Sequence, residues 1–129
     1  MQAIQITIGT PVAETHTDIG AHNSAVNYSN GDSYQGDFVN GHREGEGVYN
    51  FANGDAYQGA FEAGQFHGKG NYTTHLGDVY AGYITHGRVT GFGKITFLSR
   101  EDVTEYTGQW LDGRASGKGD VKFASKDKY

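Results

Sequence analysis

Between residues 34 and 123, aromatic and glycine residues alternate with polar residues in short runs. In the first run, Tyr34, Gly36 and Phe38 occupy every second position, with Gln35 and Asp37 between them. Side chains of a β-strand point alternately to its two faces, so this period of two predicts a strand with one aromatic and one polar face. Later runs repeat the arrangement, and 12 of the 17 aromatic residues fall on the same face. The pattern predicts a sheet with one side of aromatic residues and glycines and one solvated side.

The runs recur at a regular spacing along the chain. A Tyr-x-Gly triplet begins at Tyr34, Tyr57, Tyr80 and Tyr106, at intervals of 23, 23 and 26 residues. In each unit a glycine follows seven residues after the tyrosine, and a Gly-x-Gly pair follows that glycine. Together with the Asn-Gly-Asp and Leu-Gly-Asp triplets between units, these columns account for 19 of the 21 glycines. Such periodicity is typical of a repeat protein whose units pack on their neighbours.

Each unit has the sequence of a β-hairpin. Asn53-Gly54-Asp55 lies between two alternating runs, and Asn-Gly in that place favours a hairpin turn. Gly41 and its counterparts mark the opposite turn, where a positive φ costs glycine little. We therefore predict an all-β fold, a single-layer twisted antiparallel meander. Its units span residues 34–56, 57–79, 80–105 and 106–128, in a domain over 26–129 that opens with a half-unit at 26–33.

The repeated pattern Y-x-G-x-(F/W)-x-x-G-x-x-x-G-x-G resembles the MORN (membrane occupation and recognition nexus) repeat family. The resemblance covers residues 34–123 and departs from the family's pattern at Ile84 and in the turn over 99–103. It implies tandem β-hairpins and a non-catalytic scaffold or adaptor in a cytoskeletal, ciliary or membrane-apposed assembly. The family's name also implies an alternative, a module that binds phosphoinositides or anionic membranes.

The two ends of the chain differ from the repeat. Within residues 1–25, Ile4, Ile6 and Ile8 alternate with polar residues, which predicts one β-strand. Two interpretations stay open for this segment: a flexible tail, or an edge strand that caps the sheet or pairs with a partner. Tyr129 begins a unit that does not continue, so we expect an open edge that favours strand addition or a homo-oligomer.

Composition excludes several classes of protein. The chain has no cysteine, so disulfide frameworks, thiolate zinc sites and cysteine nucleophiles are excluded. A net charge of -5 argues against a nucleic-acid partner. The apolar runs are too short to span a bilayer, and the N-terminus lacks the basic stretch of a targeting peptide. We therefore expect a cytoplasmic protein, and from the family resemblance one associated with the cytoskeleton or a cilium.

Charge is divided unevenly along the chain. Residues 1–80 carry 2 Lys/Arg and 9 Asp/Glu, a net charge of -7, whereas residues 81–129 carry 8 and 6, a net charge of +2. A solvated strand face is the ordinary role of such residues, and contact with an anionic lipid or an acidic peptide is the alternative. The basic residues predicted to make that contact are Arg114, Lys118, Lys122, Lys126 and Lys128.

No catalytic, metal or cofactor site is predicted. The Gly-x-Gly pairs begin strands, whereas a phosphate-binding loop needs glycines that open a helix. No nucleophile elbow or repeated pair of carboxylates occurs. The histidines are expected to be polar loop residues, because a zinc site would need further ligands at short spacing. They are His16, His22, His42, His67, His75 and His86.

The aromatic face is the predicted binding surface. A single-layer sheet cannot cover all of its own rings, so we expect half-exposed rings along a groove. About nine strands at about 4.8 Å spacing give a length of roughly 40 Å, which matches a helix of about 25 residues. We therefore predict a protein partner, a helical segment, in this groove; the alternative is that the rings only pack on neighbouring glycines. The predicted groove residues are Tyr34, Tyr49, Tyr57, Tyr72, Tyr80, Tyr106 and Trp110.

Overall fold

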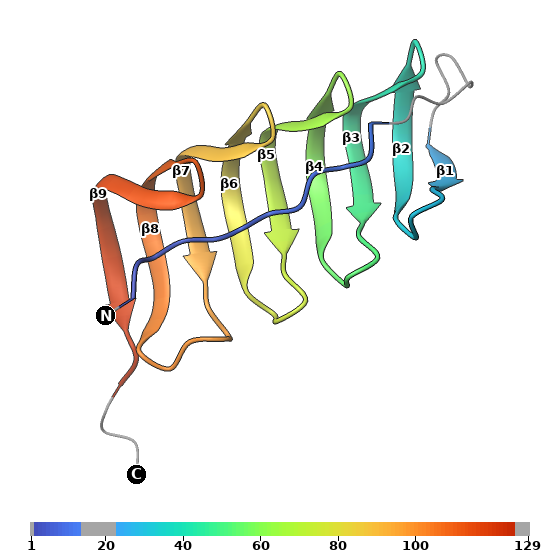
Figure 1. Ribbon diagram of the computed structural model, residues 1–129. Coiled ribbons are helices and arrows are strands. Elements are labelled where there is room, and N and C mark those ends of the chain that lie inside the picture. The colour runs from blue at the N-terminus through green and yellow to red at the C-terminus, as the bar shows by residue number, and fades with distance from the viewer. Residues whose placement is uncertain (1, 14–22, 126–129) are drawn as a thin grey trace.

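The repeats form one open antiparallel sheet (Figure 1) in the computed structural model, which describes residues 2–13 and 23–125. Nine strands follow one another in chain order, each hydrogen-bonded to the next. No helix occurs among the described residues, and the predicted all-β single-layer meander is confirmed. The strands are β1 (Ser24–Asn27), β2 (Ser33–Val39), β3 (His42–Asn50), β4 (Ala56–Glu62), β5 (Gln65–Thr73), β6 (Val79–Thr85), β7 (Arg88–Thr96), β8 (Val103–Leu111) and β9 (Arg114–Phe123).

The two ends of the hairpins carry different turns. At one end, two residues link the strands and both have positive φ, the geometry that matches the twist of a hairpin and favours glycine in the second place. At the other end, β3 stops at Asn50 and β4 begins at Ala56, so Asn53-Gly54 lies in a longer loop than its usual two-residue turn. The two-residue turns are Asn40-Gly41, Ala63-Gly64, His86-Gly87 and Asp112-Gly113.

The register places like residues opposite one another across the whole sheet. Gly36 faces Gly47, Gly59 faces Gly70, and the same glycine ladder continues to Gly119. A second ladder, two residues away on the same face, is mostly tyrosine. It runs through Tyr34, Tyr49, Tyr57, Tyr72, Tyr80, Ile95, Tyr106 and Val121. We call the side that bears both ladders the inner face.

Every second strand places a tyrosine ring on a glycine of the next strand. A Cβ atom added at Gly70 would lie 2.5 Å from Cε1 of Tyr57, so the ring occupies space that any side chain would need. The Tyr57 hydroxyl then donates a 2.7 Å hydrogen bond to the carbonyl oxygen of Ala60. The same contact joins Tyr34 to Gly47, Tyr80 to Gly93 and Tyr106 to Gly119. These contacts confirm that aromatic rings pack on neighbouring glycines, as in glycine rescue by cross-strand rings.

The rings also pack on one another along the sheet. Tyr57 stacks on Phe66 with ring centroids 4.0 Å apart, and Tyr34 meets Phe61 edge to face at 5.1 Å. Further along, Trp110 lies edge-on to Tyr80 at 5.4 Å. These offset and edge-to-face arrangements are the favoured ones for aromatic pairs. The inner face is therefore a continuous core one residue layer deep.

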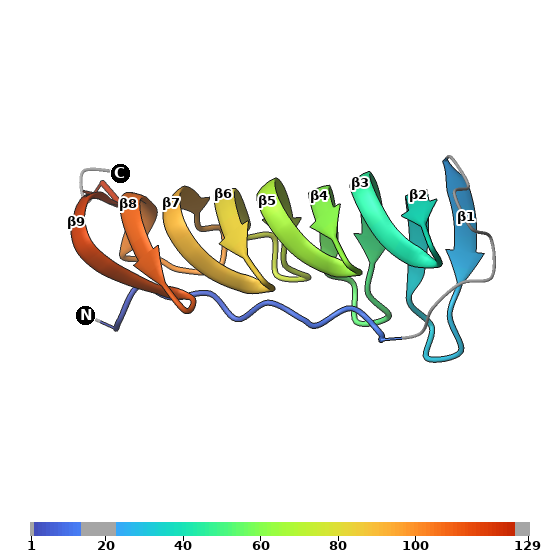
Figure 2. The ribbon, with the colours of Figure 1, turned by 90° about the horizontal axis from the view of Figure 1, so that it is seen from above.

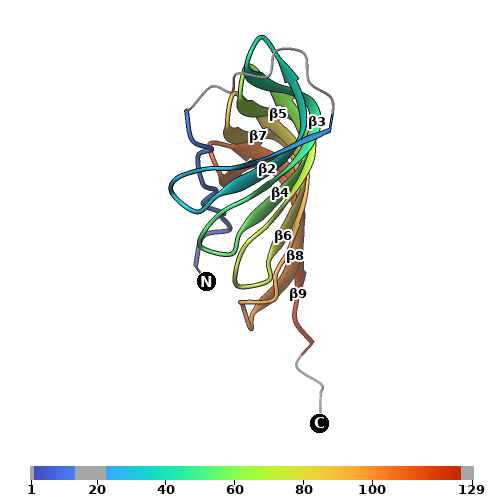
Figure 3. The same ribbon diagram turned by 90° about the vertical axis from the view of Figure 1, so that its right-hand side faces the viewer.

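The N-terminal segment crosses the inner face. Residues 2–13, which we call the strap, run across the strands from β9 toward β2 (Figures 1 and 2). Figure 3 shows the strands curving around the side on which the strap lies. The strap makes one isolated β-bridge, between Gln5 and Arg114, so it is not the edge strand that the alternation of isoleucines suggested. Among its described residues it is an extended segment laid over the sheet.

The ring-on-glycine contact gives a direct test. Replacing Gly70, whose φ is not positive, by alanine would ordinarily stabilise a strand by about 0.4–1 kcal/mol through the unfolded state. Here we expect Gly70→Ala to destabilise by about 1–3 kcal/mol, because the methyl group collides with the Tyr57 ring. Urea unfolding measures the difference. The control is Asn71→Ala, which changes the adjacent, exposed residue. If Gly70→Ala were as stable as the native chain, the packing argument would be wrong.

Candidate functional site

The inner face beneath the strap is the candidate site. All seven predicted groove residues lie on it and are buried, none of them more than 4% exposed. For these seven residues, the expectation of half-exposed rings is therefore wrong. Each ring is covered by neighbouring rings, by the close approach of glycine backbone, or by the strap, which the sequence prediction did not place there. Ile4 and Ile6 of the strap are themselves buried in the same cluster.

The tyrosine hydroxyls fall into two groups. Tyr34, Tyr57, Tyr80 and Tyr106 donate to a carbonyl oxygen three residues further along their own strand, so their polar ends serve the repeat. Tyr49 and Tyr72 lie on the alternate strands of the ladder and direct their hydroxyls to carboxylates and to the strap.

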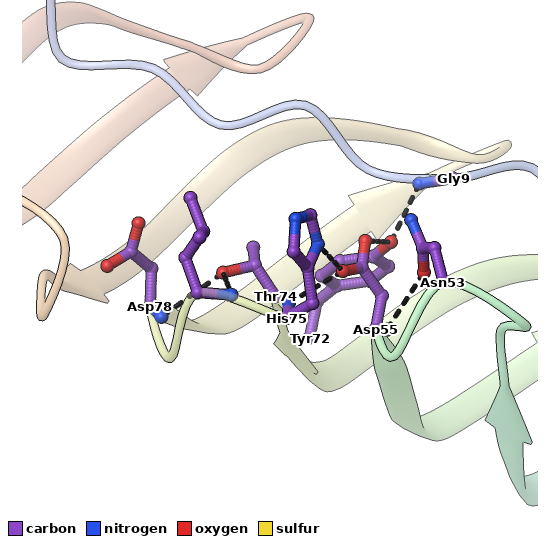
Figure 4. A network of polar contacts seen from close by, with 8 residues as sticks. Gly9, Asn53, Asp55, Tyr72, Thr74, His75 and Asp78 are labelled. Carbon is purple, nitrogen blue, oxygen red and sulfur yellow. Dashed lines mark hydrogen bonds and ion pairs between the residues drawn. The ribbon is translucent and has the colours of Figure 1, made fainter.

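Tyr72 stands at the centre of a polar network that joins two repeats to the strap (Figure 4). Its hydroxyl donates to Oδ2 of Asp55 and accepts a 2.8 Å hydrogen bond from the backbone N–H of Gly9. The other carboxylate oxygen of Asp55 lies 2.8 Å from Nδ1 of His75 and accepts the His75 backbone N–H. The aspartate of one loop therefore organises the next loop and positions a tyrosine against the strap.

The neighbouring repeat builds the same arrangement. The Tyr49 hydroxyl donates to Asp32 at 2.6 Å and accepts the backbone N–H of Val12 at 2.9 Å. In the third loop, Asp78 accepts hydrogen bonds from Ser99 and Leu98 instead of from a tyrosine. The strap thus has two tyrosine hydroxyls as polar anchors, spaced by one repeat.

These hydrogen bonds control the charge of the loop carboxylates. Burial by itself raises the pKa of Asp55, but hydrogen bonds from Tyr72 and His75 outweigh it and hold the pKa below the ordinary 3.8. The pKa of Asp32 is lowered in the same way, with Tyr49 as the main donor. Burial, and then the hydrogen bond to the carboxylate, raises the pKa of the Tyr72 hydroxyl, so it stays protonated as a donor.

Backbone contacts fix the two ends of the strap. The N–H of Ile6 donates to the carbonyl of Gly113 at 2.8 Å, and the N–H of Ala115 donates to the carbonyl of Ile4 at 3.0 Å. Near the other end, the buried guanidinium of Arg43 donates to the carbonyl of Val12. These contacts use only backbone atoms of the strap. A different extended segment could therefore make them.

Arg43 is a functional candidate that the sequence analysis missed. Its guanidinium carbon lies 5.3 Å from the ring centroid of Tyr49 and 5.5 Å from that of Tyr28, and its Nη1 donates to the Tyr28 hydroxyl. The next two hairpins have Phe66 and Val89 at the position in the repeat that Arg43 occupies. A charged residue at a position that is otherwise apolar was the signal in the sequence that could have identified Arg43. For Asp32 and Asp55 the signal was the recurring aspartate of the loop triplet.

The predicted basic cluster is not one patch. Lys118 and Lys122 lie on the outer face of β9, and Nζ of Lys122 is 3.4 Å from Glu105. Arg114 begins β9 and pairs with Gln5 of the strap. Lys126 and Lys128 lie outside the described residues.

Other kinds of site find little support in the described part of the chain. No group of three or more histidine, cysteine or acidic residues is arranged there to hold a metal ion. His67 instead accepts the backbone N–H of His86 through Nδ1, and His75 contacts Asp55. His42 begins β3, whereas His16 and His22 lie outside the described residues. Nor is there, among residues 2–13 and 23–125, a helix long and apolar enough to cross a bilayer.

The fold and the site define a tandem β-hairpin repeat protein with an N-terminal segment laid across its inner face. The family model for the MORN repeat matches residues 34–56, 57–75 and 106–128, about half of the chain. The chain therefore belongs to the MORN repeat family, a non-enzymatic repeat module whose members are generally protein- or membrane-interaction modules. The hairpin of β6 and β7 lies outside the matched residues but keeps the glycine ladder and the contact of Tyr80 with Gly93. No curated protein matched the chain.

The lowered carboxyl pKa values predict how stability depends on pH. Asp32, Asp55 and Asp78 bind protons more weakly in the folded state than in the unfolded state. Their stabilisation is complete above the unfolded pKa and is lost as pH falls through the folded pKa. We expect the free energy of unfolding to be flat from about pH 7 to 5 and to fall between about pH 4 and 2. Urea unfolding measures the profile, and Asp55→Asn should flatten it; a profile unchanged in that variant would contradict the assignment.

The role of Tyr72 as an anchor can be separated from its role in packing. Tyr72→Phe keeps the ring and removes the hydrogen bond to Gly9, which contributes about 0.5–1.5 kcal/mol. We expect amide exchange over residues 8–12 to become about two- to tenfold faster, as measured by hydrogen–deuterium exchange. Tyr57→Phe is the matched control, because its hydroxyl bonds only within its own hairpin. Equal exchange in the two variants would show that Tyr72 does not hold the strap.

Proposed function

We propose that the protein is a non-catalytic scaffold or adaptor whose inner face holds a segment of a partner protein in an extended conformation. The observation that carries this proposal is the strap, an extended segment already bound across the inner face. Ile4 and Ile6 are buried on the aromatic core, and the strap backbone is held by Tyr49, Tyr72 and Arg43. A partner segment with alternating aliphatic residues has the chemistry to make the same contacts.

An extended partner fits these contacts better than the helix expected from the length of the sheet. The N–H groups of Gly9 and Val12 reach the tyrosine hydroxyls, and the carbonyl of Val12 reaches Arg43. In a helix, most backbone N–H and C=O groups are already used in internal hydrogen bonds. An extended segment leaves these groups free to bond with the sheet, as in other strand-like modes of peptide recognition.

The strap must then compete with the partner. A tethered segment has an effective concentration in the millimolar range when its linker is short and flexible. The partner's apparent affinity is reduced by the fraction of molecules in which the inner face is open. Partner binding therefore requires release of the strap, which would make the strap an internal regulator of access.

The membrane-binding alternative has weaker support from the described residues. Lys118 and Lys122 share the outer face of β9 with Asp120, and Lys122 is paired with Glu105. A cytoskeletal, ciliary or membrane-apposed setting remains part of the proposal on the strength of the family resemblance alone.

Loosening the strap in the full-length chain tests the proposal. The double variant Ile4→Ser/Ile6→Ser removes the apolar anchors, each of which contributes about 1.5–3 kcal/mol when buried. We expect it to bind a fluorescent peptide of residues 2–13 at least about tenfold more tightly than the native chain does. Fluorescence anisotropy measures binding, and exchange protection of β2–β8 confirms that the variant is folded.

Matched variants separate groove binding from charge effects. Gln5→Ser/Thr7→Ser changes two exposed strap residues and should bind the peptide as weakly as the native chain. Adding Lys118→Glu/Lys122→Glu to the loosened chain should leave peptide binding unchanged. If the folded, loosened chain fails to bind the peptide, the inner face is only a structural core. If charge reversal abolishes binding, the contact is electrostatic and lies on the outer face.

A further inference from the structure

The outer face carries two aromatic side chains that the repeat does not require. Tyr83 on β6 and Phe92 on β7 are 45% and 54% exposed. The other hairpins provide an internal comparison, because they fold with polar or small residues at the same two positions. The residues at the position of Tyr83 are Asp37, Ala60 and Gln109, and those at the position of Phe92 are Glu46, Lys69 and Lys118. The two rings therefore serve something other than hairpin formation.

These positions form one row along the sheet. Glu46 is opposite Ala60, Lys69 is opposite Tyr83, and Phe92 is opposite Gln109. The side chains in the row change along the sheet. They are acidic on β2 and β3, aromatic on β6 and β7, and basic at Lys118 on β9. Because the strands curve away from this face (Figure 3), a partner that approaches from outside meets it along a line rather than over a broad plane.

We propose that this row binds a second copy of the chain, packed back to back with its long axis reversed. The two-fold axis lies in the interface, parallel to the strands, between β5 and β6. In this arrangement β5 of each copy faces β6 of the other, β4 faces β7, and β2 faces β9. The interface is isologous, so each favourable contact occurs twice.

The row is complementary to itself in this arrangement. Lys69 faces Tyr83 of the second copy, a cation–π pairing that also occurs within the chain, where Nζ of Lys69 lies 5.8 Å from the Tyr83 centroid. Ala60 faces Phe92, so a small side chain makes room for a large one. Asp37 faces Lys118, which places opposite charges at both ends of the interface.

A two-fold arrangement with its axis along the row, instead of across it, lacks this complementarity. With the axis along the row, every residue would face its own counterpart, which places Lys69 on Lys69 and Glu46 on Glu46. The reversed arrangement also places no like charges together in the next row, where Lys94 faces Gln58 and Asp120 faces Gln35. Charge complementarity therefore favours the reversed, back-to-back dimer over the dimer with its axis along the row.

The dimer leaves both inner faces, with their straps, outside the interface. The outer faces meet, so the two straps lie on opposite sides of the assembly. The dimer itself does not depend on what the inner face binds. If the inner face does bind a partner segment, each dimer has two such sites, and a partner with two copies of the segment gains avidity.

Sedimentation velocity on the whole chain tests the proposal. The protein concentration is varied over about 1–100 µM, because a dimer held by few anchor residues is expected to assemble in that range. We expect a concentration-dependent dimer whose dissociation constant rises at least about tenfold in Phe92→Lys. That substitution introduces the residue that β5 and β9 carry at this position, so the hairpin tolerates it. Tyr83→Gln, which copies β8, should have a similar effect.

An exposed aromatic residue elsewhere provides the control. Phe123 lies at the end of β9, the open edge of the sheet, and is 64% exposed. Phe123→Ser should leave the dimer intact. If Phe123→Ser abolishes association and Phe92→Lys does not, the copies pair through the sheet edge and the proposal is wrong. A chain that stays monomeric throughout the concentration range also overturns it.

Discussion

The contact between a tyrosine ring and a glycine of the next strand is the interaction on which the rest of the sheet depends. A single-layer sheet has no second layer to bury its inner face, so the rings provide that layer themselves. Tyr57 can lie flat against the backbone only because Gly70 has no side chain, and its hydroxyl then reaches a carbonyl of its own strand. Each such ring ties two strands together. The stability of the sheet is accordingly a sum over neighbouring strands.

The same ladder creates the polar features of the inner face. Alternate strands point their tyrosine hydroxyls toward the long loops, where Asp32 and Asp55 accept hydrogen bonds from Tyr49 and Tyr72. Since a hydroxyl both donates and accepts, each of these tyrosines retains an acceptor directed at the strap. A packing arrangement that stabilises the repeat thus also positions fixed acceptors for the backbone of a bound segment, and the strap uses them.

The two faces of the sheet differ in burial and in the side chains that they carry. The inner face is apolar, closed and covered by a segment of the same chain. The outer face is polar in most hairpins, and the aromatic pair Tyr83 and Phe92 interrupts that polarity. Because side chains on the two faces point in opposite directions, substitutions on one face leave the contacts of the other intact. The proposed binding along the inner face and the proposed association through the outer face can therefore be tested separately.

The sequence by itself determined the hairpins, their order and the identity of the two ladders. Those features are local: period-two alternation selects the face, and a glycine such as Gly41 selects the turn. Burial of the groove rings and the position of the strap were decided only in the tertiary structure. Alternation of Ile4 and Ile6 indicates an extended apolar segment, but its partners include Gly113, more than a hundred residues away. No local pattern records such a contact, because it depends on the curved surface that the assembled repeats create.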